Sequence, residues 1–156
     1  MDQTITCLEV KKELYKACEA FVADKLSNIQ IIMVANQKAL ENESKSSAGD
    51  KHETGRAMLH LEMEKGSQQI AVVSAMQEVL EKIDFSKTTG QVRLGSLIIS
   101  SRGNYYLSIS AGLVKIGLVE YFAVSTSSPI GKLLLGKKIG SVIHLTEKQI
   151  TILDVL

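Results

Sequence analysis

The stretch VADKLSNIQIIMVANQKAL, residues 22–40, decides the first half of the fold. Its regularly spaced positions step by 4, 3, 4, 3 and 4 residues through Val22, Leu26, Ile29, Met33, Asn36 and Leu40. This is the a/d spacing of a helix that buries one narrow apolar seam against another helix. Asn36 is a polar interruption of the kind that fixes the register between two helices.

A second run of the same kind is LHLEMEKGSQQIAVVSAMQEVL, residues 59–80. Its seam steps by 4, 3, 4, 3, 4 and 3 residues through Leu59, Met63, Gly66, Ile70, Val73, Gln77 and Leu80. The intervening residues 41–55, ENESKSSAGDKHETG, are rich in Ser, Asn and Gly, which favour a turn. The two seams predict an antiparallel coiled-coil hairpin with arms of about 30–35 residues, or roughly 45–50 Å. The pattern leaves open a second arrangement, two helices of a compact bundle.

In the second half of the chain, the spacing of the apolar residues is no longer helical. Only three glycines precede residue 89, whereas eight follow it. Five segments there alternate in polarity or are rich in β-branched residues, which predicts strands: GSLIISS (95–101), NYYLSIS (104–110), VEYFAVS (119–125), GSVIHL (140–145) and QITILDVL (149–156). Arg102-Gly103, between the first two segments, predicts a hairpin turn.

One short helix is predicted in SSPIGKLLLG, residues 127–136. Ser127 or Ser128 is the N-cap, Pro129 occupies the first turn and Gly136 follows the end. The fold class is therefore α+β: a helical hairpin over residues 1–88 and a small antiparallel β domain with one short helix over 89–156. Because a unit of about 65 residues is marginal alone, we expect it to dock against the base of the hairpin. Residues 85–90 are the expected junction.

Composition and charge argue against several classes of function. The net charge of +1 gives no overall attraction to nucleic acid or membrane, although residues 1–88 balance to −3 and residues 89–156 to +4. No basic start followed by an apolar run is present at the N-terminus, and the longest apolar stretch, residues 31–35, is too short to span a bilayer. Cys7 and Cys18 lie about 16 Å apart on one predicted helix, so both thiols are expected to be reduced. We therefore expect a cytoplasmic protein without a membrane role.

The predicted hairpin tip carries the most informative polar residues. Asp50 and Glu53 are three residues apart at the start of the second helix, so their carboxylates point in similar directions. Together they can share a Mg²⁺ ion, whose remaining coordination a partner must complete. Carboxylates at a helix N-terminus also serve capping and the macrodipole, and both roles can hold at once.

Other candidate chemistry is weaker. His52, His60 and His144 have no clustered third metal ligand, and solvent-facing or packing roles account for them. Nucleophilic triads, phosphate loops and dinucleotide fingerprints are absent. Lys132, Lys137 and Lys138 form a basic edge around the short helix, for which a solvated face is the ordinary explanation.

The segment SSPIGKLLLGKKIGSVI, residues 127–143, resembles the C-terminal signature of the Gre family of bacterial transcript-cleavage factors. The family's S-P-x-x-x-x-L-x-G-K-x-x-G-D core is matched in order by Ser128, Pro129, Leu134, Gly136, Lys137 and Gly140. Ser141 stands where the family usually has Asp. The tip motif G-D-x-x-E is matched by Gly49, Asp50 and Glu53, and the resemblance spans residues 8–156.

This resemblance implies a transcription elongation factor that is not itself an enzyme. A coiled-coil hairpin would enter the secondary channel of bacterial RNA polymerase, and Asp50 and Glu53 would help hold a catalytic Mg²⁺ shared with the polymerase. The polymerase would then cleave the 3′ end of a backtracked nascent RNA. The C-terminal domain, FK506-binding-protein-like in the family, would contact the channel rim through Ser128, Pro129, Lys132 and Lys137. Lys51 and Arg56 would face the RNA.

Two alternatives remain open at this stage. A channel-occupying regulator would bind polymerase and modulate or inhibit it without stimulating cleavage. A generic scaffold would use the hairpin to bind an unrelated protein. Autonomous catalysis is the weakest interpretation, because the sequence contains no nucleophile–base set and no complete metal site.

Overall fold

The structure is a computed structural model that describes residues 6–45 and 50–156. The chain divides into two compact units. Residues 22–77 form the first, which we call the hairpin unit, and residues 1–21 together with 78–156 form the second, the sheet unit. Across the described ranges, no helix combines the length and the apolar character that a membrane crossing requires.

Two long helices account for the first half of the chain: α1 (Cys7–Lys45) and α2 (Asp50–Glu81). The sequence at the start of α1 explains where it begins. Thr6 and Glu9 form a capping box in which the Glu9 amide donates to Thr6 Oγ1 (3.3 Å) and the Thr6 amide donates to Glu9 Oε2 (2.9 Å). Within the hairpin unit, α1 extends about 36 Å and α2 about 42 Å at 1.5 Å per residue.

The predicted helical seam is confirmed at nearly every position. In α1 each seam residue is buried or half-buried, and in α2 the same holds from Leu59 to Val73. The prediction for Gln77 is wrong, because that side chain is exposed and Met76 is the half-buried residue instead. An α-helix has 3.6 residues per turn, so a strict seven-residue repeat drifts around the helix and the seam moves by one position.

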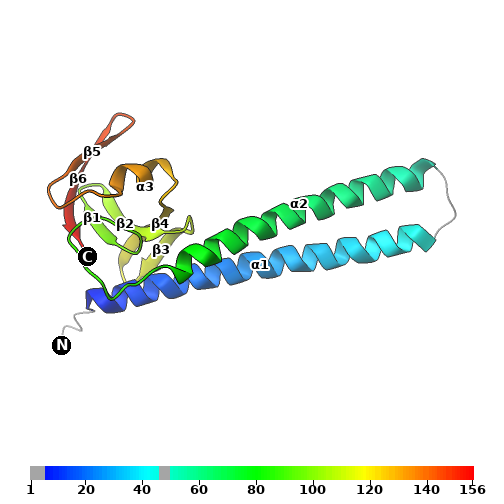
Figure 1. Cartoon of the computed structure of the whole chain (residues 1–156), viewed down its shortest axis with the longest axis horizontal. Helices are drawn as coiled ribbons and strands as arrows, with labels where there is room; N and C mark the ends of the chain where they lie inside the picture. Colours follow the sequence, from blue (N-terminus) through cyan, green and yellow to red (C-terminus); the bar gives the residue numbers. More distant parts are fainter. Residues whose placement is uncertain (1–5, 46–49) are drawn as a thin grey trace. The chain divides into compact units, whose positions relative to one another are not determined.

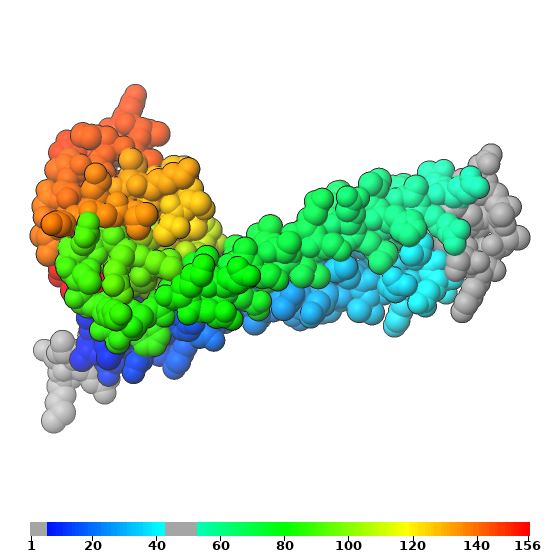
Figure 2. All heavy atoms as spheres, in the orientation of Figure 1, coloured from blue at the N-terminus to red at the C-terminus, as the bar shows by residue number. Residues whose placement is uncertain are grey.

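The two helices of the hairpin unit run antiparallel and lie side by side (Figure 1). Gly66 of α2 faces Met33 of α1 so closely that a Cβ built on Gly66 would stand 2.9 Å from Met33 Cγ. In the space-filling view, side chains of the two helices meet along this unit (Figure 2). The two predicted long helices are thus present and packed against each other, and the absence of a side chain at Gly66 makes room for Met33.

The sheet unit contains one six-stranded sheet in the order β3-β4-β2-β1-β6-β5 (Figure 1). Its strands are β1 (Leu97–Ser100), β2 (Gly103–Ser108), β3 (Gly112–Ile116), β4 (Val119–Ser125), β5 (Val142–Leu145) and β6 (Lys148–Val155). The predicted β1–β2 hairpin is confirmed, with Ser100 paired to Gly103. All five predicted strand segments are strands in the structure.

The sheet differs from the prediction in two ways. It is mixed rather than antiparallel, because β2 and β4 pair in parallel from Asn104↔Tyr121 to Ser108↔Ser125. The sequence interpretation also missed β3, which forms a hairpin with β4 at one edge of the sheet. The chain leaves β2, runs out along β3 and returns as β4 into the space between them. Strand propensity carries no information about this order of pairing.

One face of the sheet packs against the short helix α3 (Pro129–Leu134). The predicted helix is confirmed: Ser128 is the N-cap, Pro129 is in the first turn, and Gly136 has a positive φ of 82° just beyond the end. Leu134 is fully buried in the core together with residues from four strands and the segment before them, namely Val92, Ile98, Leu107, Ile143, Ile150, Ile152 and Val155.

The first turns of α1 and the end of α2 belong to the same compact unit as the sheet, as expected for docking at the hairpin base. Cys18 is buried and its Sγ lies 3.5 Å from Ser108 Oγ of β2. Tyr15 Oη donates to the Leu80 carbonyl (3.1 Å), and its ring lies 5.5 Å from that of Phe85. Cys7 and Cys18 are both free thiols, in agreement with the prediction.

Lys11 is buried in this base, which the sequence did not indicate. Removal from water lowers the pKa of its amine, and Arg93 acts in the same direction, while Cys7 and Asp84 oppose them. The four-carbon stem of a lysine covers apolar surface as a hydrophobic side chain would. Lys11 therefore contributes packing at a position where a strict apolar pattern would place a leucine or methionine.

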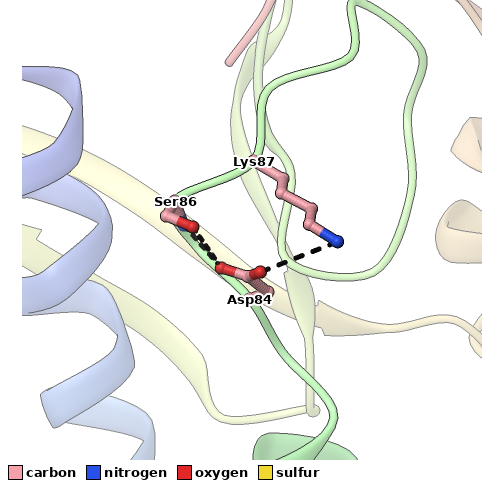
Figure 3. A network of polar contacts seen from close by, with 3 residues as sticks. All are labelled: Asp84, Ser86 and Lys87. Carbon is pink, nitrogen blue, oxygen red and sulfur yellow. Dashed lines mark hydrogen bonds and ion pairs between the residues drawn. The ribbon is translucent and has the colours of Figure 1, made fainter.

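The segment after α2 is ordered by one carboxylate (Figure 3). Asp84 Oδ1 accepts from the Ser86 amide (3.1 Å) and from Ser86 Oγ (2.5 Å), while Asp84 Oδ2 lies 3.9 Å from Lys87 Nζ. The hydrogen bonds from Ser86 are the main reason that the pKa of Asp84 is lowered. This side-chain turn holds part of the predicted junction, residues 85–90.

Candidate functional site

The candidate site at the hairpin tip begins where α2 begins. Asp50 is the first residue of α2 and Glu53 follows in the first turn, with its side chain exposed. The side chains of residues 43–52 lie outside the described part of the structure, and so does Gly49. The side chains of Asp50 and Lys51 are therefore among the residues that the structure does not describe. Arg56 is exposed one turn later in α2.

The fit of these residues to Mg²⁺ can be judged from their chemistry. Magnesium prefers carboxylate oxygens and keeps several of its waters. Among the residues whose side chains are described, no group of three or more His, Cys, Asp or Glu gathers in a way that could hold a metal ion. Glu53 thus offers one exposed carboxylate with the right kind of oxygen, and Asp50 stands one helical turn before it in the chain. Two carboxylates of this kind would supply fewer than half of the six ligands that Mg²⁺ binds.

The second candidate surface is the loop that leads into α3. Ser128 is held by hydrogen bonds to two residues, because its Oγ donates to the Ser125 carbonyl (2.7 Å) and accepts from the Gly131 amide (3.0 Å). The Ser128 amide in turn donates to Ser125 Oγ (3.1 Å). With its hydroxyl committed to capping, Ser128 shapes this loop, and the exposed ring of Pro129 is what the loop presents to solvent.

Gly131 is the residue in this loop whose importance the sequence interpretation missed. A Cβ added there would stand 1.9 Å from the Ser125 carbonyl oxygen, and that oxygen is backbone. Only glycine permits α3 to approach the end of β4 this closely. A glycine inside a six-residue helix, where it weakens the helix, is the signal that pointed to a close backbone approach.

The two predicted contact lysines lie on either side of the end of α3. Lys132 and Lys137 are both exposed. The backbone of Lys137 is held in place, since its carbonyl accepts from the Val92 amide (2.7 Å). An open hollow of about 330 Å³ lies beside this contact and is lined by Thr89, Gln91, Val92, Arg93, Leu135 and Gly136. Arg93, which lines this hollow, is a cation that the sequence interpretation did not include.

The three histidines were predicted to be solvent-facing or packing residues. His60 in α2 and His144 in β5 are both exposed. His52 falls among the residues whose side chains are outside the description.

Known proteins offer no further guide to this chain. Comparison with protein-family models, with curated proteins and with solved structures finds no match. The functional interpretation therefore depends on the residues themselves.

Proposed function

We propose that this protein binds bacterial RNA polymerase, inserts the tip of its hairpin into the secondary channel and stimulates cleavage of backtracked transcripts by the polymerase active site. The observation that carries the proposal is the exposed Glu53, three residues after Asp50, in the first turn of α2 where the hairpin turns back.

Under this proposal the protein is not an enzyme by itself. Asp50 and Glu53 would hold a Mg²⁺ shared with the polymerase, and this ion would activate water and stabilise developing charge during phosphodiester hydrolysis. The carboxylates of Asp50 and Glu53 would position this ion and leave its other ligands to the partner. Lys51 and Arg56 would face the phosphates of the nascent RNA 3′ end.

The sheet unit would provide the grip on the polymerase. In this proposal it has an FK506-binding-protein-like fold and contacts the channel rim through the Ser128–Pro129 loop, Lys132 and Lys137. The capped, glycine-dependent geometry of that loop supports this role, because a rigid loop loses little entropy when it docks. A cytoplasmic location follows from the partner.

A second function is favoured by one specific feature of the tip. Glu53 is followed by Thr54, Gly55 and Arg56, which departs from the E-N-A-E-Y continuation common in the Gre family. Gly55 weakens the start of α2 by about 1 kcal/mol relative to alanine. A second helix that starts with this weaker residue suits a protein that occupies the channel and modulates polymerase without stimulating cleavage.

The test is a transcript-cleavage assay on stalled, backtracked bacterial RNA polymerase with Mg²⁺. We expect the native protein to shorten the transcripts and the Asp50→Ala/Glu53→Ala variant to have no effect on them. Glu62→Ala/Glu64→Ala, which removes two exposed carboxylates further along the same helix, is the matched control and should retain activity.

Two outcomes would redirect the interpretation. If neither protein yields shortened transcripts but both alter elongation, the channel-occupying function replaces the cleavage function. If neither protein binds polymerase at all, both functions are wrong and the hairpin serves another partner.

A further inference from the structure

Strand β3 forms one edge of the six-stranded sheet, and β5 forms the other (Figure 1). Within the described part of the chain, β3 pairs with β4 on one side and with no strand on the other. Its residues Gly112, Leu113 and Lys115 are exposed. A Cβ built on Gly112, at one end of β3, or on Gly117, just beyond the other end, meets no atom within 4 Å outside its chain neighbours. The outer edge of β3 is therefore open to solvent.

The pairing with β4 determines which backbone groups of β3 face outward. The turn between the two strands has two residues, and the residues that flank it, Ile116 and Val119, are paired. Residues that close a two-residue hairpin exchange both backbone hydrogen bonds, and such pairs alternate along an antiparallel ladder. Val114 therefore directs its amide and carbonyl toward β4, whereas Leu113 and Lys115 direct theirs away from it. Among the described residues, no backbone hydrogen bond outside the strand ladders reaches these outward groups.

These outward groups select the shape of an occupant. An extended backbone offers amides and carbonyls at the same spacing as a strand edge, so it can pair with each of them. A helix uses its own amides and carbonyls internally and cannot do so. The two amides and two carbonyls of Leu113 and Lys115 thus favour an added strand over any other kind of segment.

An apolar row on one face of the sheet ends at this edge. Leu113 lies opposite Phe122 of β4, which lies opposite Tyr105 of β2, and the two ring centroids are 6.1 Å apart. Residues directly opposite each other share a face of the sheet. Leu113 is 53% exposed and Phe122 is 42% exposed, so the row is uncovered where it reaches β3. An apolar side chain opposite Leu113 on an added strand would extend the row.

The charge on β3 selects a second side chain of the added strand. Lys115 follows Leu113 by two residues, so it lies on the same face. Glu120 of β4 is opposite Lys115, but the two side chains form no ion pair. An acidic residue opposite Lys115 on the outer side would place this cation between two carboxylates that are about 10 Å apart, two strand spacings. Opposite charges on directly paired residues stabilise strand pairing.

A second copy of this chain fits the edge less well. The two edge strands, β3 and β5, contain no carboxylate, so neither strand of a second copy could place an acid opposite Lys115. A contact limited to the five residues of β3 is also much smaller than the about 20–30 residues per side of a stable interface. The edge therefore suits a short acidic segment of another protein.

We propose that the outer edge of β3 binds an extended segment of a partner protein as an additional antiparallel strand. An apolar residue of that segment would lie opposite Leu113, and an acidic residue would lie opposite Lys115. Because the added strand runs in the opposite direction, its acidic residue comes two positions before the apolar one. This site is in the sheet unit and does not depend on the proposed action of the Asp50–Glu53 tip on RNA polymerase.

The experiment uses the full chain and a fluorescent peptide of about eight residues, which spans about 26 Å when extended. Its centre reads glutamate–valine–leucine, and its flanks consist of threonine and serine. Binding is measured by fluorescence anisotropy at low and at high salt. We expect saturable binding, and about two- to fivefold weaker binding of a second peptide with lysine in place of glutamate. This difference should shrink at high salt.

Methyl groups on single amides of the peptide test the backbone pairing. In the proposed register the amide of the peptide leucine faces β3, and that of the valine faces away. Methylation of the leucine amide removes a hydrogen bond at the contact and should weaken binding on the order of tenfold. Methylation of the valine amide is the matched control and should leave binding unchanged.

Two variants of the chain locate the site. Lys115→Glu should weaken binding of the glutamate peptide and strengthen binding of the lysine peptide, a reversal that a folding defect would not produce. Lys148→Glu makes the same change at an exposed lysine at the start of β6, so it is the matched control and should bind both peptides as the native chain does.

The proposal is overturned if the glutamate peptide shows no saturable binding or if the two methylated peptides lose affinity equally. A reversal of peptide preference in Lys148→Glu as large as that in Lys115→Glu would also overturn it. Sedimentation velocity tests the remaining occupant: a concentration-dependent dimer that the peptide dissociates would assign the edge to a second copy instead.

Discussion

The hairpin unit and the sheet unit bury their apolar residues in different ways. In the sheet unit a core closed on all sides leaves Ile98, Leu107 and Leu134 with no exposed surface. In the hairpin unit only one seam is covered, and large apolar residues such as Ile31 and Val72 are more than half exposed. A two-helix seam has no third layer to cover it, so the same kind of side chain contributes less stability there. The closed unit is suited to hold a shape, and the open one is suited to meet a partner.

Truncation of one core leucine in each unit should show this difference most strongly. Leu107→Ala in β2 is expected to lower the free energy of unfolding of the sheet unit by about 2–5 kcal/mol, because a fully buried side chain leaves a cavity. Leu26→Ala in the half-buried seam should cost about 1 kcal/mol. Urea unfolding with amide hydrogen exchange separates the two units. Equal losses would mean that the seam is as closed as the core.

Two glycine substitutions test how each unit tolerates added volume. Gly131→Ala is expected to destabilise the sheet unit by about 1–3 kcal/mol, since the new Cβ meets the rigid Ser125 carbonyl. Gly66→Ala meets the side chain of Met33, which can move, and alanine improves the helix by about 1 kcal/mol. Its net effect should therefore be close to zero. Thermal unfolding of both variants measures the contrast, and a larger loss for Gly66→Ala would contradict it.

The closed core also contains a polar group without a partner. Tyr106 is fully buried, and among the described residues its hydroxyl has no hydrogen-bond partner. Burial is the main reason that the pKa of this phenol is raised. Tyr106→Phe is therefore expected to stabilise the sheet unit by about 1 kcal/mol.

The control is Tyr15→Phe, which removes the hydrogen bond to the Leu80 carbonyl and should destabilise by about 1 kcal/mol. Chemical denaturation of both variants distinguishes the two tyrosines. If both changes destabilise, an ordered water satisfies Tyr106.

The smallest expected effect comes from the exposed turn after α2. The hydrogen bonds to Asp84 lower its pKa from the ordinary value of 3.8. At a pH between the lowered folded value and 3.8, the folded state therefore binds fewer protons than the unfolded state. The stability that this carboxylate contributes is complete above the unfolded value and is lost as the pH falls through the lowered folded value. The difference in stability between the native chain and Asp84→Asn should therefore shrink below pH 3.8. A difference that stays constant from neutral to acidic pH would show that the charge has no part in it.

Much of the fold could be predicted because its signals are local. Ser128, Pro129 and Gly136 mark the ends of α3 through caps and fixed backbone angles. The exposure of Glu53 could also be expected from its place in the first turn of a surface helix. By contrast, β3 was missed because it has only five residues, three of them exposed, and so carries too weak an alternation of polar and apolar residues to stand out. The role of Asp50 and Glu53 remains a prediction, since their partner lies outside the chain.

By itself, the sequence determined the two helices, their common seam and the segments that become strands. Each of these follows from spacing along the chain, which is independent of distant residues. Only the tertiary structure decided that β4 enters between β3 and β2, that Lys11 is buried and that Gly131 cannot carry a side chain. These features depend on which surfaces meet, because pairing order and close approach are properties of packing between residues far apart in the chain.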